Sequence, residues 1–287
     1  MLWNTQTEIS FFENALKNFA SPEQLFYNLS DKYYAYIPKG KEANGQTLQS
    51  RNSLIGSYTE NWCKNLFEPI AKKSNLFAIN GAVCEEIGLT KQSPGDLVIT
   101  DLDSKYLKAE NIKIIFEIKM SIVSNYEYSK SNNEVKYLGD FKQHKGNPSL
   151  LRSDSMLKAI GKSINIRVSG LESSKIPIIV LGNSPITESY SSKVDFLKSS
   201  GVIQGFWSLN SKPSETEDYI LFSQNKSFIT IKDEKELKNL LTSLIAFEMN
   251  FFSSMLPKSD LGNIIKISSE ESNDVARAEK FLSLIRG

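Results

Sequence analysis

A short, continuously apolar segment, residues 176–181, constrains the fold of this chain more than any other feature. It reads IPIIVL, and the turn-forming residues 182–185 end it. A strand with apolar side chains on both faces is typical of the centre of a parallel or mixed sheet, where helices cover both sides. The segment therefore predicts an α/β protein.

The segments before and after it predict the remaining elements. Apolar residues at helical spacing predict helices over 7–19, 55–72, 190–199 and 234–256, and further helices start at Ser21-Pro22-Glu23 and near residues 147–149. Apolar runs predict a mostly antiparallel meander over 76–79, 83–84, 97–99 and 113–120, with Asn80-Gly81 as a hairpin turn, and later strands near 202–208 and 219–230. We expect the polar residues 38–52 and 124–148 to form loops. Together these elements predict a mixed central β-sheet flanked by helices.

The chain has 287 residues, and we expect one compact domain with three regions. These are a helical N-terminal region with a polar loop (1–54), a sheet-containing core (55–232) and a helical C-terminal region (233–287). Residues 234–256 are apolar on more than one face of their helix. This pattern predicts that they either pack deeply or form a dimer surface.

Three residues limit the chemistry, because His144, Cys63 and Cys84 are the only histidine and cysteines in the sequence. A structural zinc site needs four ligands, and catalytic zinc sites generally use two or three histidines or a Cys/His mixture, so one chain can build neither. Two cysteines also make no disulfide framework, which favours a reduced, intracellular compartment. Hydrolytic chemistry must then use carboxylates, lysines, hydroxyls and a hard metal ion.

Charge and hydropathy add two expectations. Lys plus Arg number 34 and Asp plus Glu number 33, so only a local basic patch would favour a polyanionic partner. The sequence has no run of 18 apolar residues, and its acidic, amphipathic N-terminus lacks the basic start of a signal peptide. We therefore expect a cytoplasmic protein without a membrane partner.

Two carboxylates and a lysine stand out among the predicted strands. Glu117 and Lys119 share one face of the strand 113–120, because side chains alternate along a strand. Asp96 starts the preceding strand, and it faces Glu117 if the two strands form an antiparallel hairpin. Charges buried there need to be paired or to bind a metal. Carboxylate and carbonyl oxygens are ligands that suit Mg²⁺ or Mn²⁺.

At these positions the chain resembles the PD-(D/E)xK nuclease superfamily. The matching residues are Asp96, within Pro94-Gly95-Asp96, and Glu117-Ile118-Lys119; the departure is the glycine between Pro94 and Asp96. The resemblance covers about residues 57–185. Size and order of elements look most like a type II restriction endonuclease, which implies a restriction-endonuclease-like nuclease core over residues 55–232.

The resemblance implies a role for each matching residue. Asp96 and Glu117, with the backbone carbonyl of Ile118, would bind Mg²⁺, for which Mn²⁺ can substitute, and Lys119 would position or activate the attacking water. The implied reaction is hydrolysis of a phosphodiester in double-stranded DNA, which leaves 5′-phosphate and 3′-hydroxyl ends. Members of the superfamily often add an acidic residue from a preceding helix to the metal site. Glu60 is the candidate here, and a solvated carboxylate is the alternative.

Basic and hydroxyl side chains provide candidates for DNA contacts. They are Arg152, Ser153, Lys158 and Lys162, on or beside one predicted helix, and Lys142 and Lys145, in the polar loop before it. A helix N-terminus with Arg and Ser binds phosphate, although a solvated face with an Asp154–Lys158 pair explains the same residues. We expect His144, in the same loop, to contact the DNA backbone or solvent rather than to act as a base.

The sequence thus predicts a Mg²⁺-dependent, site-specific DNA endonuclease. We expect it to act as a homodimer, because two-fold symmetry suits the cutting of both strands of a palindrome. Two alternatives stay open. One is a repair or junction-resolving nuclease of the same superfamily, and the other is a non-catalytic DNA-binding protein on a degenerate nuclease core.

Overall fold

The centre of the protein is a mixed sheet of six strands. The computed structural model describes residues 1–29, 32–42, 49–246, 249 and 256–286. The strands lie in the order β10 (Phe228–Thr230), β9 (Gly205–Ser208), β8 (Ile178–Gly182), β5 (Ile112–Ile118), β4 (Gly95–Thr100) and β3 (Phe77–Ala82). β3, β4 and β5 pair antiparallel, whereas β5, β8, β9 and β10 pair parallel. The predicted α/β fold with a mixed central sheet is confirmed.

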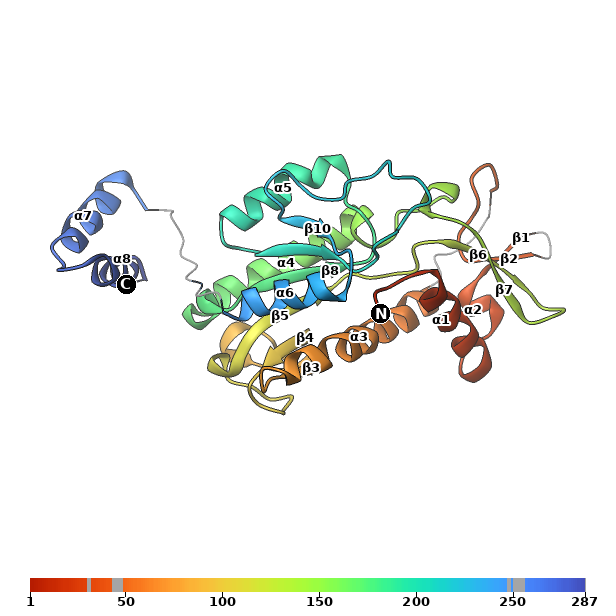
Figure 1. Cartoon of the computed structure of the whole chain (residues 1–287), viewed down its shortest axis with the longest axis horizontal. Helices are drawn as coiled ribbons and strands as arrows, with labels where there is room; N and C mark the ends of the chain where they lie inside the picture. The colour runs from red at the N-terminus through yellow and green to blue at the C-terminus, as the bar shows by residue number, and fades with distance from the viewer. Residues whose placement is uncertain (30–31, 43–48, 247–248, 250–255, 287) are drawn as a thin grey trace.

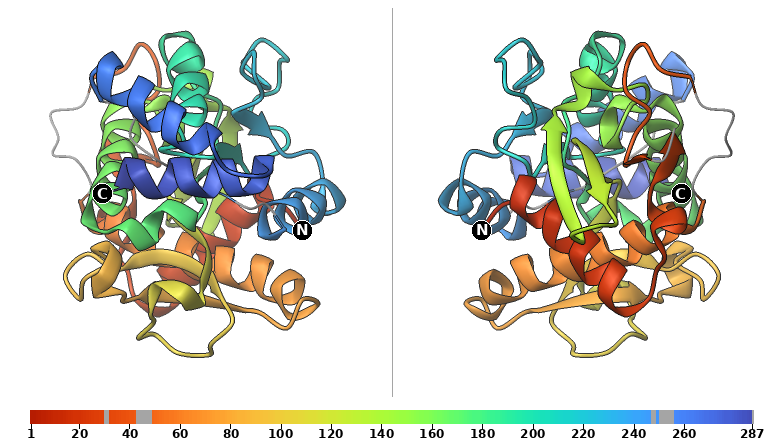
Figure 2. Two further views of the ribbon diagram at one scale, coloured as in Figure 1. Left: turned by 90° about the vertical axis from the view of Figure 1, so that its left-hand side faces the viewer. Right: turned by 90° about the vertical axis from the view of Figure 1, so that its right-hand side faces the viewer.

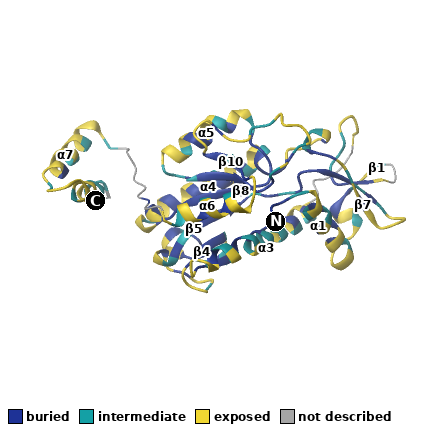
Figure 3. Cartoon of the chain, in the orientation of Figure 1, coloured by how far each residue is buried: buried dark blue, intermediate teal, exposed yellow. Residues whose placement is uncertain are grey.

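Helices cover both faces of this sheet (Figure 1). α3 (Gln49–Lys72) and α6 (Glu234–Ile245) pack on one face, where Phe67 and Phe116 have ring centroids 4.6 Å apart. α4 (Ser153–Ser169) and α5 (Glu188–Ser199) pack on the other face, in a core that includes Val180 and Phe206. β8 lies between β5 and β9 and is buried along its whole length, as its apolar sequence predicts (Figure 3).

A second sheet of four strands lies at one end of the molecule (Figure 2, right). Its strands are β1 (Tyr27–Leu29), β2 (Lys32–Tyr34), β6 (Asn125–Ser129) and β7 (Glu134–Gly139), in that order, and all their pairings are antiparallel. α1 (Thr5–Asn18) packs on this sheet through Phe12, whose ring centroid lies 5.4 Å from that of Tyr126. The short α2 (Pro22–Leu25) precedes β1 and starts at the predicted Ser-Pro-Glu sequence.

The prediction of a loop over residues 124–148 is wrong, because β6 and β7 form a hairpin there. Tyr126 pairs with Tyr137, and Tyr128 pairs with Val135. Tyrosines therefore form most of the inward face of the hairpin. They alternate with polar residues, so the two-residue period of a strand is present although the segment has no apolar run. The N-terminal region 1–54 is likewise not only helical, since β1 and β2 belong to it.

Two predicted boundaries near the first sheet also change. Asn80-Gly81 does not turn the chain: both residues lie within β3, where Gly81 adopts a φ of 67°. This left-handed conformation favours glycine, which explains the Asn-Gly signal without a hairpin. α3 starts at Gln49, within the loop predicted over 38–52, of which residues 43–48 lie outside the described residues.

In the C-terminal half, the structure differs from the sequence prediction mainly in the lengths of the helices and strands. The helix predicted near residues 147–149 is a 3-10 turn there, and α4 starts at Ser153. The strand predicted over 219–230 is reduced to β10. The helix predicted over 234–256 ends at Ile245, and its residues 247–248 and 250–255 lie outside the described part. α6 buries one stripe, with Leu237 and Leu241 fully buried, while its other side is exposed, so it does not pack deeply on all sides.

Two more helices, α7 (Lys258–Ser269) and α8 (Asp274–Arg286), follow α6 and contact each other. Both lie within the region predicted to be helical (233–287). None of the helices in the described residues is long and apolar enough to cross a membrane.

Glu8 connects α1 to the chain segment that follows β5. Its carboxylate is buried and accepts hydrogen bonds from the indole of Trp3 (2.9 Å), from the backbone N–H groups of Val123 (2.7 Å) and Ser124 (3.1 Å), and from the hydroxyl of Tyr126 (2.8 Å). Burial raises the pKa of Glu8 to about 7, although these hydrogen bonds favour the charged form. Glu8 is therefore a buried acid that holds the N-terminal helix against residues 123–126.

The stability of the protein should depend on the protonation of Glu8. Its pKa is higher in the folded than in the unfolded chain, so its contribution is fully present below about pH 4.5 and is lost as pH rises through about 7. We expect the free energy of unfolding of the wild type to fall over this range by up to about 3 kcal/mol relative to Glu8→Gln. Urea unfolding of both proteins across this pH range measures the difference. A difference that is constant with pH would contradict this role.

Candidate active site

β4 and β5 bring Asp96 and Glu117 together at one end of their hairpin. Leu97 pairs with Phe116 in the antiparallel ladder, so the next positions along the two strands, Asp96 and Glu117, lie opposite each other. Asp96 Oδ2 also accepts a hydrogen bond of 2.8 Å from the backbone N–H of Ile118. This bond fixes the Asp96 carboxylate against the end of β5.

Two lysines neutralise these carboxylates. Lys119 forms an ion pair with Glu117 Oε1, and its Nζ lies 3.7 Å from Asp96 Oδ2. Lys162 reaches in from α4, and its Nζ lies 2.7 Å from Asp96 Oδ1 and 2.7 Å from Glu117 Oε2. We call Asp96, Glu117, Lys119 and Lys162 the carboxylate cluster. Each lysine in it contacts one oxygen of each carboxylate.

Lys162 is the member of the carboxylate cluster that the sequence does not identify. The sequence places it among candidate phosphate contacts on a helix face, but its side chain is only 19% exposed and points at the carboxylates. It borders the buried stripe of α4, which includes Ala159, Ser163 and Ile166. One signal in the sequence could have identified Lys162. It is a lysine beside the buried stripe of a helix, and that helix covers the face of the sheet that bears the carboxylates.

Burial raises the pKa of both carboxyls, whereas the two lysines lower it, and the balance differs between Asp96 and Glu117. Burial would raise the pKa of Asp96, but the ammonium groups of Lys162 and Lys119 outweigh it, and the pKa is lowered. Glu117 is only 5% exposed, and burial together with repulsion from Asp96 raises its pKa despite both lysines. Burial would lower the pKa of Lys162, but its two carboxylate partners raise it, so this ammonium stays charged. Neighbouring carboxyls whose pKa values are pushed apart are frequent in catalytic sites.

The carboxylate cluster fits a hard divalent cation. Asp96 Oδ1 and Glu117 Oε2 already contact a common cation, the Lys162 ammonium. Glu117 Oε2 is buried, so its charge needs a cation close to it. The backbone carbonyl of Ile118 lies beside them and accepts a 3.2 Å hydrogen bond from Lys119 Nζ. These oxygens are the ligand types that Mg²⁺ prefers.

The protein supplies only part of such a coordination shell. No group of three or more His, Cys, Asp and Glu residues that could hold a metal occurs within the part of the chain that the structure describes. Mg²⁺ is commonly bound by one or two carboxylates and completes its shell with water and substrate phosphates. The pair Asp96 and Glu117 matches that pattern.

Glu60, the acidic candidate from the preceding helix, is half-buried on α3. Burial first, and then the negative charge of Asp96, raises the pKa of Glu60, so its carboxyl lies within electrostatic range of the cluster. No ion pair joins Glu60 to the cluster lysines among the residues described. Its part in a metal site stays a prediction.

Hydrogen bonds beyond β5 fix the backbone of Lys119. Its N–H donates to the carbonyl of Leu181 in β8 at 2.7 Å, and its own carbonyl accepts from Ser149 Oγ at 2.7 Å. Ser149 Oγ in turn accepts a 3.0 Å hydrogen bond from the backbone N–H of Asn183. The Asn183 side chain donates to the carbonyl of Ser121 at 2.6 Å. Leu181 therefore holds the N–H of Lys119, and Ser149 and Asn183 brace its carbonyl and the chain that follows it.

A cavity of about 490 Å³ opens beside Lys119 and Ile118. α3, the four-stranded sheet region, residues 145–149 and the start of α4 all contribute to its lining. Within the described part of the chain, its charged lining residues are all basic, and they are Arg51, Lys119, Lys145 and Arg152. We call it the basic cavity. Positive charge with hydroxyl and amide donors is the environment that suits a phosphate group.

The predicted DNA contacts differ in their position relative to this cavity. Lys145 and Arg152 line it. Ser153 and Lys158 lie nearby on α4 and are exposed, with Lys158 Nζ 3.1 Å from the Asp154 carboxylate. Lys142 is directed elsewhere, because its Nζ donates to the hydroxyl of Thr216 (2.6 Å) and the carbonyl of Asp218 (2.8 Å).

The prediction for His144 is wrong, because its ring is buried rather than available to DNA or solvent. It stacks on Tyr36 with ring centroids 3.9 Å apart, and its Nε2 lies 3.0 Å from the carbonyl of Val123. His144 therefore joins residues 36 and 123 as part of the packing between the two sheets.

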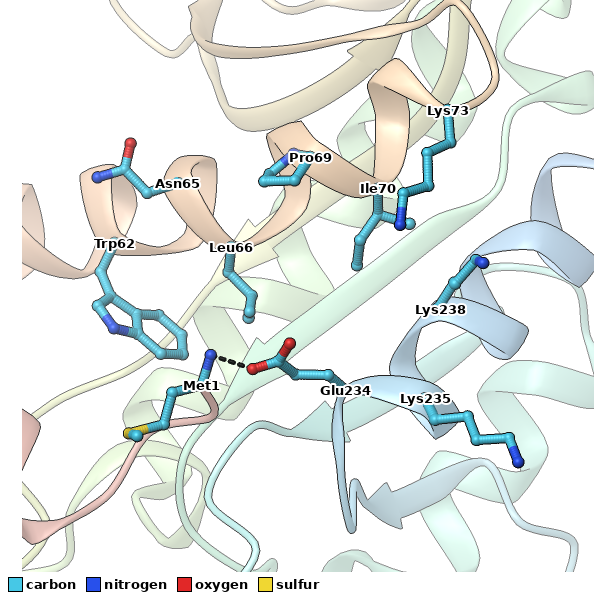
Figure 4. A pocket seen from close by; sticks show the side chains of 10 residues that line it. All are labelled: Met1, Trp62, Asn65, Leu66, Pro69, Ile70, Lys73, Glu234, Lys235 and Lys238. Carbon is cyan, nitrogen blue, oxygen red and sulfur yellow. Dashed lines mark ion pairs between the residues drawn. The ribbon is translucent and has the colours of Figure 1, made fainter.

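A larger cavity, of about 590 Å³, lies between α3 and α6 (Figure 4). Trp62, Leu66 and Ile70 form an apolar wall, and lysines line the side opposite. The acidic residue in the described lining, Glu234, is paired with the amino group of Met1. This cavity has no pair of carboxylates within its described lining, so the carboxylate cluster is the better candidate for catalysis.

A search of protein-family models found no match to this chain, and neither did searches of curated proteins and of solved structures.

The fit of the carboxylate cluster to a divalent cation is testable by direct binding. We expect wild-type protein to bind Mn²⁺ or Mg²⁺ in isothermal titration calorimetry, and Asp96→Asn to weaken that binding by at least about tenfold, because it removes a ligand charge. Asp101→Asn is the matched control, since Asp101 Oδ2 pairs with Lys113 at 2.7 Å at the other end of the same hairpin. Equal affinities in all three proteins would place the metal elsewhere.

Proposed function

We propose that the protein is a Mg²⁺-dependent endonuclease of the type II restriction class, which hydrolyses phosphodiesters at specific sites in double-stranded DNA. The products would carry 5′-phosphate and 3′-hydroxyl ends. The observation that carries this proposal is the convergence of Asp96, Glu117 and Lys119 beside the basic cavity. Hydrolysis of a phosphodiester uses all of these parts: carboxylates for a hard cation, a lysine near the attacked group, and basic residues for the polyanion.

The topology around the cluster supports a nuclease core of the restriction-endonuclease type. Asp96 and the Glu117-Ile118-Lys119 triplet lie on adjacent antiparallel strands, β4 and β5. The chain then reaches β8, which pairs parallel with β5, by way of α4. An antiparallel meander that carries the acidic residues, followed by a crossover helix and a parallel strand, is the order that the resemblance implies.

Each residue of the site has a specific task in this proposal. Asp96, Glu117 and the Ile118 carbonyl would hold Mg²⁺, which would supply a Lewis acid that stabilises charge on the phosphoryl group. Lys119 positions the attacking water and balances charge at the scissile phosphate. Its backbone is held by Leu181 and Ser149, so its side chain starts from a fixed position.

The basic cavity is the part of the surface that we assign to the DNA backbone. Lys145 and Arg152 lie in its lining, and Ser153 and Lys158 extend the polar surface along α4. Cutting both strands of a palindrome requires two such sites related by two-fold symmetry, so the proposal includes a homodimer. We place the protein in the cytoplasm, where its DNA substrate is accessible.

Substitution of Lys119 tests the catalytic assignment. We expect wild-type protein with Mg²⁺ to cut a long DNA of known sequence at discrete sites, and EDTA to abolish cutting. Lys119→Ala should lower the cleavage rate by about 10²–10⁴-fold, the usual contribution of a positioned proton-transfer group, and leave DNA binding largely unchanged. Gel analysis with end sequencing measures both the rate and the sites.

Lys113→Ala is the control for this experiment, because Lys113 lies on the same strand and forms a similar ion pair with Asp101. Full activity of Lys119→Ala would contradict the site. Cutting of branched DNA without cutting of linear duplex would favour a repair or junction-resolving nuclease. Metal-free binding of DNA with no cutting of either substrate would favour a non-catalytic DNA-binding protein.

The assignment of the basic cavity is testable through the salt dependence of DNA binding. Each lost phosphate contact lowers the slope of log affinity against log salt by about 0.9. We expect Lys145→Ala and Arg152→Ala each to reduce the slope by about one contact, as measured by fluorescence anisotropy with a duplex in EDTA. Lys198→Ala, an exposed lysine on α5, should leave the slope unchanged. Equal slopes in all four proteins would place the DNA elsewhere.

A further inference from the structure

Lys162 occupies the position that a shared cation would take between the two carboxylates. Its Nζ is 2.7 Å from one oxygen of Asp96 and 2.7 Å from one oxygen of Glu117. Lys119 contacts the other oxygen of each. The two lysines thus divide the four carboxylate oxygens between them, so one lysine can leave while the other keeps its contacts.

The contacts of Lys162 are close on both sides. The ammonium forms a hydrogen bond with Asp96 Oδ1. It also lies 2.7 Å from Glu117 Oε2, an oxygen that is buried. Lys162 is therefore the cation that neutralises this buried oxygen in the metal-free protein.

Lys162 also has a path out of the cluster. Its side chain is 19% exposed, on a long and flexible stem. The side chain of Lys119 is equally exposed, at 19%, but the proposed function assigns it to the attacking water, so Lys162 is the lysine that can leave.

The charges of the cluster make the two cations exclusive. With both lysines in place, two negative and two positive groups balance. A divalent ion added to that set would place three cations around two carboxylates in a site that excludes most water, where repulsion is weakly screened. Departure of Lys162 removes that repulsion and frees one oxygen of each carboxylate.

We propose that Lys162 is an internal counter-cation that stabilises the metal-free site and must leave before a divalent metal binds between Asp96 and Glu117. This inference rests on the proposed function, because it assumes that the cluster is a metal site. Lys162 then determines the concentration of free metal that is required to fill the site. The metal-free protein keeps both carboxylates paired, and metal binding is weakened by the free energy required to displace the lysine.

Mn²⁺ binding to Lys162→Met tests this directly, since methionine keeps the length of the stem without the charge. We expect Lys162→Met to bind Mn²⁺ about tenfold more tightly than the wild type in calorimetry and in electron paramagnetic resonance titrations. Lys162→Arg, which keeps a cation, should stay close to the wild type. Lys113→Met, which breaks the Asp101 pair at the other end of the hairpin, is the control and should not change the affinity.

Thermal unfolding provides a second measurement in case Lys162→Met folds poorly without metal. This variant leaves two carboxylates with one lysine, so its metal-free melting temperature should fall, and saturating Mn²⁺ should raise it by more than it raises that of the wild type. Equal or weaker Mn²⁺ binding by Lys162→Met, or no binding by any protein, would overturn the proposal.

A cleavage assay on the same proteins separates this inference from the proposed function. Tighter Mn²⁺ binding by Lys162→Met, with no cutting of DNA by the wild type, would support the counter-cation and contradict the nuclease. Metal-dependent cutting by the wild type, with equal Mn²⁺ affinity in both proteins, would support the nuclease and overturn the counter-cation.

Discussion

The burial of two negative charges at the end of the β4–β5 hairpin is the constraint on which the rest of the site depends. Asp96 and Glu117 extend from strands whose other residues are almost all apolar and buried. Carboxylates in such a place stay ionised only if cations are close. Lys119 from β5 and Lys162 from α4 supply them. The charge balance therefore joins the sheet to its covering helix, and the same balance makes the cluster suitable for a metal ion.

In the proposed function, the surroundings of the cluster hold it beside the surface that we assign to the DNA backbone. The chain leaves β5, is braced by Ser149 and Asn183, and then meets the Glu8 carboxylate at residues 123 and 124. These bonds join the six-stranded sheet to the four-stranded one, and the basic cavity lies where they meet. A flexible junction would let Lys119 and Lys145 move independently. A braced junction keeps Lys119 and the basic lining in a fixed relation, and the proposed function needs this to position a phosphodiester.

The parts of the site that lie close in sequence could be predicted, and those that depend on tertiary packing could not. Alternation along one strand places Glu117 and Lys119 on one face, and hairpin pairing brings Asp96 opposite Glu117. Lys162 is 66 positions from Asp96, so only the packing of α4 on the sheet reveals it. The β6–β7 hairpin was not predicted, because tyrosines occupy most of its inward face and the segment has no apolar run. The hairpin turn predicted at Asn80-Gly81 was wrong, because a glycine with positive φ occurs within strand β3 here as well as in turns.

The most direct test of this account is a crystal structure of the protein with Mn²⁺, with anomalous differences measured at the manganese edge. We predict one anomalous peak between Asp96 and Glu117, near the Ile118 carbonyl, with Lys119 in place and Lys162 withdrawn from both carboxylates. The account would be contradicted by a map without a peak at this site at saturating Mn²⁺, in which Lys162 still bridges the two carboxylates.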